Sequence, residues 1–161
     1  MLEISELRQE DIAEIAAAFS QIGWNKPASL YESYLLKQTQ ALRTVLVARL
    51  DGAFAGYVTL WHQNPAGIPE IQDLNVLPKH RRRGLGTRLL EQAEALAASR
   101  SSRVAISVGL TADYGSAQRL YVRRGYLPDG RGLTRHGTPL EVGETTTLDE
   151  NVVLSFTKDL G

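Results

Sequence analysis

The chain has 161 residues, of which 43% are hydrophobic and 22% charged, and its formal net charge is zero. These values are typical of a single globular domain spanning 1–161, and the lack of a net charge argues against nucleic acid as a partner. The absence of cysteine excludes disulfides, thiolate catalysis, cysteine-ligated zinc and an acyl-cysteine intermediate.

Hydrophobic periodicity and turn residues predict strands that alternate with helices. In chain order we expect a strand over 2–7, helices over 10–20 and 27–40, strands over 45–48, 55–61 and 70–77, a helix over 84–100, a strand over 104–108, a helix over 116–124 and a strand over 152–157. The dipeptide Asp51-Gly52 predicts a tight hairpin turn, and Gly125 a left-handed helix end. The segment 129–149 is glycine-rich and polar, and no helix or strand is assigned to it.

The predicted strand, helix and strand between residues 70 and 108 require a parallel pair with a right-handed crossover. The remaining connections favour antiparallel neighbours. We therefore expect an α/β fold of the α+β type, with a mixed, mostly antiparallel sheet and helices on both faces. No apolar stretch approaches the ~20 residues of a membrane span, and the first residues lack the pattern of a signal peptide. A cytoplasmic location without membrane contact is the expectation.

A basic turn containing two glycines follows the strand over 70–77 and opens the next helix. The segment Arg81-Arg82-Arg83-Gly84-Leu85-Gly86 would combine free helix N–H groups, close backbone approach and guanidinium donors. These properties predict a pyrophosphate site. The residues match neither a P-loop nor a dinucleotide fingerprint. The alternative is a helix start whose arginines are merely solvated.

A second motif lies downstream, where Ala117 and Leu120-Tyr121 precede Gly125-Tyr126. Together, the two segments resemble the GNAT superfamily of acyl-CoA-dependent N-acetyltransferases, with Tyr126 where the family often has Phe. The resemblance spans nearly the whole chain. It implies central strands that splay apart to hold the pantetheine arm of acetyl-CoA, and Gly109 is where we expect this sheet to open.

The resemblance implies a set of cofactor-binding residues in three parts of the chain. Backbone groups of the strand, above all at Leu74 and Val76, would polarise the thioester carbonyl and pair with the pantetheine, and the turn would hold the pyrophosphate. The full set comprises Leu74, Asn75, Val76, Arg81, Arg82, Arg83, Gly84, Leu85, Gly86, Thr87, Tyr114, Ala117 and Arg124. Tyr114 stands where the family often has Asn, so either Tyr114 packs against the cofactor instead or this contact is absent. Arg124 would reach the CoA 3′-phosphate, unless it is merely solvated. Asp113 is expected to cap the helix.

Tyr121 occupies the position of the family's general acid, and a phenol can protonate a departing thiolate. The alternative for Tyr121 is simple packing against the sheet. Glu70 is the expected general base, unless it is only a solvated carboxylate at a strand end. Asp73, which strand alternation places on the opposite face from Glu70, and His62 are the other candidates. The three scattered histidines lack metal-ligand spacing, so we expect no metal.

The resemblance predicts direct acetyl transfer from acetyl-CoA to a primary amine in a ternary complex, and the alternative is an acyl-CoA sensor without activity. A small amine or a protein amine would be the acceptor partner, and a homodimer is compatible with the family. The acceptor is expected between residues 23–26 and 129–149. Trp24 and Tyr31 would form an apolar wall, and Glu70 would attract a cation together with Glu141 or Glu144.

Overall fold

The computed structural model describes residues 1–161, which form one eight-stranded sheet with the order β1-β2-β3-β4-β5-β8-β6-β7. Only β4 and β5 are parallel, and all other neighbours are antiparallel. The strands are β1 (Leu2–Glu6), β2 (Arg43–Leu50), β3 (Ala53–Trp61), β4 (Glu70–Val76), β5 (Arg103–Gly109), β6 (Leu127–Arg135), β7 (Thr138–Pro139) and β8 (Val152–Asp159). The expected mixed sheet with one parallel pair is confirmed.

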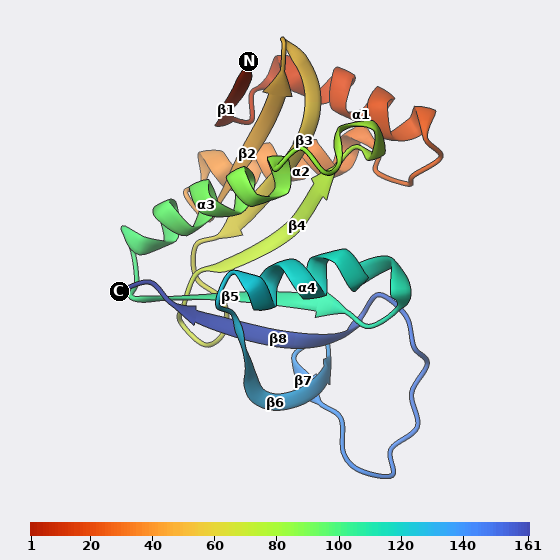
Figure 1. Ribbon diagram of the computed structural model, residues 1–161, viewed down its shortest axis with the longest axis vertical. Coiled ribbons are helices and arrows are strands. Elements are labelled where there is room, and N and C mark those ends of the chain that lie inside the picture. The colour runs from red at the N-terminus through yellow and green to blue at the C-terminus, as the bar shows by residue number, and fades with distance from the viewer.

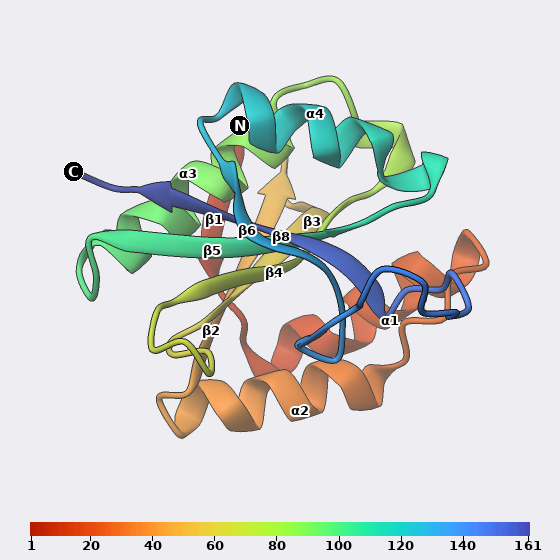
Figure 2. The same cartoon turned by 90° about the horizontal axis from the view of Figure 1, so that it is seen from below.

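Four helices cover the sheet, two on each face (Figures 1 and 2). They are α1 (Ile12–Gln21), α2 (Ala28–Thr39), α3 (Leu85–Ala98) and α4 (Gly115–Arg123). Figure 2 shows α1 and α2 on one face and α3 and α4 on the other. Each predicted helix is present, because each carries apolar residues at helical spacing toward the sheet.

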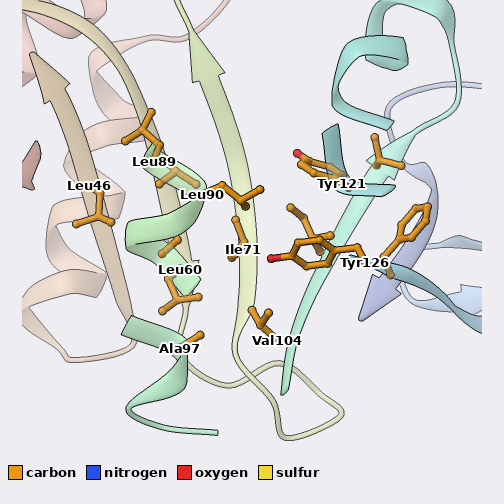
Figure 3. Close-up of a cluster of buried hydrophobic side chains, with 14 of the residues drawn as sticks. Leu46, Leu60, Ile71, Leu89, Leu90, Ala97, Val104, Tyr121 and Tyr126 are labelled. Carbon is orange, nitrogen blue, oxygen red and sulfur yellow. The ribbon is translucent and has the colours of Figure 1, made fainter. Parts of the chain in front are cut away.

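Each face of the sheet has its own apolar core. Leu89, Leu90 and Ala97 of α3 pack over the central strands, and Tyr121 and Tyr126 extend this core past β4 (Figure 3). On the opposite face, α1 and α2 bury an aromatic cluster that includes Phe19 and Tyr31. The two cores fix the helices on either side of β4 and β5, where the sheet opens.

The sequence pattern assigns no helix or strand to segment 129–149. In the structure, β6 and β7 occupy part of it. The strand β6 pairs with β8 through Leu133 to Arg135, after an irregular stretch that contains Gly130 and Gly132. Most β6 side chains are exposed. The strand therefore lacks the apolar alternation that reveals strands in a sequence, and its pairing with β8 is a long-range event.

The sheet opens between β4 and β5 as the family resemblance implied, but not at Gly109. The two strands pair only at Glu70 with Ala105 and at Ile71 with Ile106, and then diverge. By contrast, β5 stays paired with β8 through Gly109. Gly109 serves another purpose, since a Cβ atom there would lie 2.4 Å from the ring of Tyr114.

A β-bulge in β4 lies directly after the last pair with β5. Tyr57 of β3 opposes Asn75 and Thr59 opposes Gln72, so that Val58 alone faces two β4 residues. Asp73 is one of these two residues and has a φ of 54°. The extra residue shifts the alternation of side chains along the strand. As a result, Asp73 lies on the same face as Glu70, and the expected opposite placement is wrong.

Candidate active site

A cleft of about 590 Å³ runs through the opening between β4 and β5. Its walls come from five regions: the loop between α1 and α2, the β4 bulge, the end of β5, α4 with the turn before it, and the turn before β8. The lining residues are Trp24, Asn25, Lys26, Asp73, Leu74, Asn75, Ser107, Val108, Tyr114, Ala117, Tyr121 and Glu150. Five of the residues predicted from the sequence as catalytic or cofactor-binding thus meet here: Leu74, Asn75, Tyr114, Ala117 and Tyr121.

The free edge of β4 presents backbone groups to the cleft. The N–H of Leu77 donates to the carbonyl of Ala55 in β3 (2.9 Å). Because successive residues of a strand direct their backbone groups to opposite edges, the N–H and carbonyl of the preceding Val76 face β5. The same alternation turns Leu74 to that edge. Because β5 has diverged there, these groups lack a strand partner. The edge is therefore ready to pair with an extended amide-containing chain.

The basic turn lies at the start of α3. None of residues 81–87 lines the cleft, but the guanidinium of Arg81 lies over the ring of Trp24, which does. Gly84 is the residue before the helix, with a left-handed φ of 77°, and no side chain caps the helix. No protein acceptor receives the N–H groups of residues 82 to 87. Arg82, with a φ of 63°, also adopts the left-handed region. A turn with a left-handed glycine, six free N–H groups and three arginines has the donors and the positive charge that a pyrophosphate requires.

Gly86 connects the turn to the cleft. A Cβ atom at this position would lie 3.9 Å from side-chain carbons of Val76 and Leu120. These two residues belong to β4, which borders the opening, and to α4, which contributes to the cleft wall. The absence of a side chain at Gly86 keeps the passage between the turn and the β4 edge clear.

Tyr121 projects from α4 into the cleft, and Figure 3 shows its hydroxyl pointing toward β4. The residue is only 5% exposed, and burial raises the pKa of Tyr121 to about 12. The phenol is therefore protonated at neutral pH and available as a donor. Tyr114 stands beside it, with its ring seated over Gly109. Asp113 does not cap α4 as expected, because a short 3-10 turn (Ala112–Tyr114) precedes the helix and makes Tyr114 the capping residue.

Glu70 begins β4 at the closed end of the opening and does not line the cleft. Its carboxylate accepts a hydrogen bond from Gln72 (2.7 Å). Burial raises the pKa of Glu70, although hydrogen bonds and the charges of Arg131 and Arg43 partly oppose this effect. The raised pKa moves the carboxyl toward the range that suits a general base.

Asp73 lines the cleft but is saturated with donors. Lys26 Nζ lies 2.9 Å from Oδ1, and the hydroxyls of Tyr34 and Tyr57 and the amide of Asn75 also donate to this carboxylate. Burial alone would raise the pKa of Asp73, but Lys26 and the hydroxyl donors outweigh it and lower the pKa. Asp73 is consequently a poor proton acceptor.

Two further residues proposed from the sequence, Arg124 and His62, lie outside the cleft lining and have partners elsewhere. Arg124 pairs with Glu91 (3.4 Å) and Glu94 (3.2 Å) of α3 and lies outside the cleft lining. His62 is hydrogen-bonded to Thr44 and to the carbonyl of Ala41 at the end of the β2–β3 hairpin.

On the acceptor side, Trp24 lines the cleft, with the guanidinium of Arg81 over its ring at 5.6 Å. Tyr31 is fully buried and cannot form a cleft wall. Glu141 and Glu144 of segment 129–149 do not line the cleft, whereas Glu150, just after this segment, does. No sequence signal distinguished Glu150 or Ser107, because their positions depend on how β5 and β8 are arranged.

Comparisons with known proteins agree with this geometry. The acetyltransferase (GNAT) family profile matches residues 9–126. No curated protein sequence matches the chain with significance. No helix of the protein is long and apolar enough to cross a membrane.

Three solved structures illustrate the similarity of the fold. A GNAT-family acetyltransferase from Streptococcus pneumoniae has 22% identity and a TM-score of 0.72, with 100% of both chains covered. An N-acetyltransferase from Staphylococcus aureus Mu50 has 14% identity and a TM-score of 0.74, with 100% of this chain and 99% of that chain covered. The ribosomal-protein-S18-alanine N-acetyltransferase of Escherichia coli has 16% identity and a TM-score of 0.71, with 99% and 94% covered. The family profile, the fold and the cleft together place this chain in the GNAT family of acetyl-CoA-dependent N-acetyltransferases.

Proposed function

We propose that this enzyme transfers the acetyl group of acetyl-CoA directly to a primary amine held in the same cleft. The observation that carries this proposal is the continuity of three features: the uncapped start of α3, the free edge of β4 and the Tyr121 hydroxyl. They match the pyrophosphate, the pantetheine and the sulfur of one extended thioester substrate. The chain has no cysteine to carry the acetyl group, which favours direct transfer.

The residues divide the work of the reaction. The N–H groups of residues 82 to 87 and the neighbouring arginines hold the pyrophosphate. The Leu74 N–H donates to the thioester oxygen, where negative charge develops as the amine nitrogen attacks the carbonyl carbon. The new N–C bond replaces the C–S bond, and Tyr121 gives its proton to the departing thiolate. The positively charged nitrogen of the new bond then loses its second proton to solvent, and solvent returns a proton to the Tyr121 phenolate.

The acceptor must lose a proton before it can attack. We assign this proton to Glu70, reached through water, because its pKa is raised by burial whereas Asp73 is already saturated. Glu150 is the carboxylate of the cleft lining without a protein cation partner, and it would attract an ammonium group. Structural neighbours include a spermidine N-acetyltransferase chimera and an Arabidopsis thaliana protein bound to the bisubstrate analogue CoA-Ac-MVNAL. Both polyamines and peptide N-termini therefore belong in an acceptor screen.

Two measurements test the proposal. Calorimetry with acetyl-CoA should give saturable binding that Gly86→Val abolishes, and release of free CoA should depend on an added primary amine. The screen should include polyamines, amino acids, aminoglycosides, and peptides with free N-termini or lysines. Binding without amine-dependent CoA release across these classes would identify an acyl-CoA sensor instead. The absence of binding at micromolar acetyl-CoA would refute both readings.

A further inference from the structure

One cluster of the cleft has no part in the chemistry just described. It consists of Asp73, Lys26, Tyr34, Tyr57 and Asn75, and we call it the Asp73 cluster. Its members come from the α1–α2 loop, α2, β3 and β4, so a single carboxylate ties four segments together. The Lys26 and Asp73 side chains are only 20% and 22% exposed.

The carboxylate holds a strained piece of backbone. Asp73 is the left-handed residue of the β4 bulge, and this conformation is unfavourable for most L-residues. The Asn75 amide donates both to the Asp73 carboxylate (2.8 Å) and to its backbone carbonyl (3.2 Å), which bridges the bulge from within. Gly56 packs against the same backbone so closely that a Cβ atom would lie 2.5 Å from the carbonyl oxygen of Asn75. Leu74 lies between these two bridged residues.

Lys26 links the bulge to the acceptor side of the cleft. Its ammonium pairs with Asp73 and also lies over the rings of Phe19 (5.9 Å) and Tyr57 (5.8 Å). The flanking Trp24 and Asn25 line the cleft from the same loop. A cation enclosed by a carboxylate and two rings is held in one place, so the loop is attached to the bulge.

We propose that the Asp73 carboxylate is a positioning residue, which fixes the bulge so that the Leu74 N–H points into the cleft and which fixes the acceptor loop through Lys26. This inference deepens the proposed function and rests on it for its kinetic consequences. It accounts for a buried carboxylate that is saturated with donors and therefore unsuited to accept a proton. It also gives a role to the left-handed residue at the point where the strands separate.

Asp73→Asn is the decisive variant, because asparagine adopts left-handed conformations readily and preserves the shape of the side chain. It removes the charge that holds Lys26 and replaces one of the two accepting oxygens by an NH2 donor, so that two of the four donors lose their acceptor. Lys26→Met removes the cation while keeping the chain length, and Lys26→Arg restores it. Arg49→Met is the matched control, since Arg49 pairs with Asp11 and Glu14 (both 2.7 Å) outside the cleft lining.

The assay measures kcat, the acceptor KM and the acetyl-CoA Kd with an amine found in the screen. Asp73→Asn should lower kcat about tenfold or more, approaching the loss of an oxyanion donor, and should leave the acetyl-CoA Kd nearly unchanged. It should also raise the acceptor KM, because it releases Lys26. Lys26→Met should mainly raise the acceptor KM, and Lys26→Arg should restore it. Adding Lys26→Met to Asp73→Asn should have little further effect, because the two residues act through one contact. Wild-type kcat and KM in Asp73→Asn, or equal losses in Arg49→Met, would overturn the proposal.

A second readout does not depend on activity. Amide hydrogen exchange at Asn75 and Leu77, which report on the pairing of β4 with β3, should be faster in Asp73→Asn and unchanged in Arg49→Met. If the wild-type protein acetylates no amine, the proposed function fails while this experiment still decides the role of Asp73. Unchanged exchange in Asp73→Asn would contradict the inference. Should Asp73→Asn not fold, Tyr34→Phe removes one donor from the cluster. Faster exchange at Asn75 and Leu77 in Tyr34→Phe would then support the inference, and unchanged exchange would contradict it.

Discussion

Gly86→Ala is expected to stabilise the fold and, at the same time, to weaken acetyl-CoA binding. Gly86 is the second residue of α3, and its φ is not in the left-handed region, so alanine fits its backbone. The added Cβ would make ordinary contacts at 3.9 Å with Val76 and Leu120 rather than clash. Alanine is favoured over glycine inside a helix by roughly 0.5–1 kcal/mol. Allowing for the position near the helix end, a gain of about 0.5 kcal/mol corresponds to a Tm increase of about 1–2 °C for a chain of this size.

The same methyl group should weaken acetyl-CoA binding, because it fills the passage between β4 and α4 through which the substrate must run. We expect the Kd to rise at least tenfold, equivalent to about 1.4 kcal/mol, and more for Gly86→Val. Thermal unfolding and calorimetry on the same samples check both signs. A variant that binds acetyl-CoA as tightly as the wild type would show that the basic turn is not the phosphate site. Weak binding together with a Tm below that of the wild type would show that the added Cβ does not fit between Val76 and Leu120.

Gly84→Ala provides the contrasting case. Nothing lies within 4 Å of its added Cβ, but Gly84 has a φ of 77°. A left-handed alanine costs roughly 1–2 kcal/mol, so this variant should lose stability where Gly86→Ala gains it. The difference between the two glycines follows from backbone conformation alone.

The other predictions concern single side chains of the cleft and its surroundings. Tyr121→Phe should lower kcat by about 10²–10⁴-fold with little change in the acetyl-CoA Kd, and an unchanged kcat would reduce Tyr121 to a packing role. The rate should rise toward alkaline pH as the acceptor ammonium loses its proton, and Glu70→Gln should lower kcat and move this rise to higher pH, because only amine deprotonated by solvent can then react. A wild-type pH profile with chemistry rate-limiting would remove Glu70 as the base. Because burial raises the folded-state pKa of Glu70, its ionisation destabilises the fold as pH rises, so Glu70→Gln should raise the Tm above that pKa. This gain should disappear below about pH 4, the range of an unfolded glutamate, and a gain that persists there would contradict the argument. Asp73→Asn should behave oppositely, since the folded-state pKa of Asp73 is lowered: it should reduce the Tm at neutral pH, by an amount that shrinks as pH falls through that pKa. Arg82→Ala should weaken acetyl-CoA binding by less than Gly86→Val, because an exposed arginine contributes about 1 kcal/mol or less, and calorimetry would reveal a reversed order.

The sequence by itself determined the elements that bury a periodic apolar face. The helix from Leu85, for example, carries leucines and alanines at helical spacing. The strand that ends at Val76 stops just before Pro78, which cannot donate a backbone hydrogen bond to a sheet. The motif around Gly84 and Gly86 also predicted the turn with free N–H groups at the start of α3, which we propose as the phosphate site, because such groups at a helix start are a local property of the chain. The parallel pair followed from the crossover rule, which depends on element order alone.

The tertiary structure decided what depends on contacts between distant segments. The β4 bulge arises from the register between β3 and β4, so alternation along the sequence put Asp73 on the wrong face. The pairing of exposed β6 with β8 and the arrival of Glu150 at the cleft have no local signature. Lys26 and Asp73 are 47 residues apart, and only the packing of α2 against the sheet brings their charges within 2.9 Å. Local patterns record what each segment buries, whereas the identity of the partner that each segment meets is a property of the folded chain.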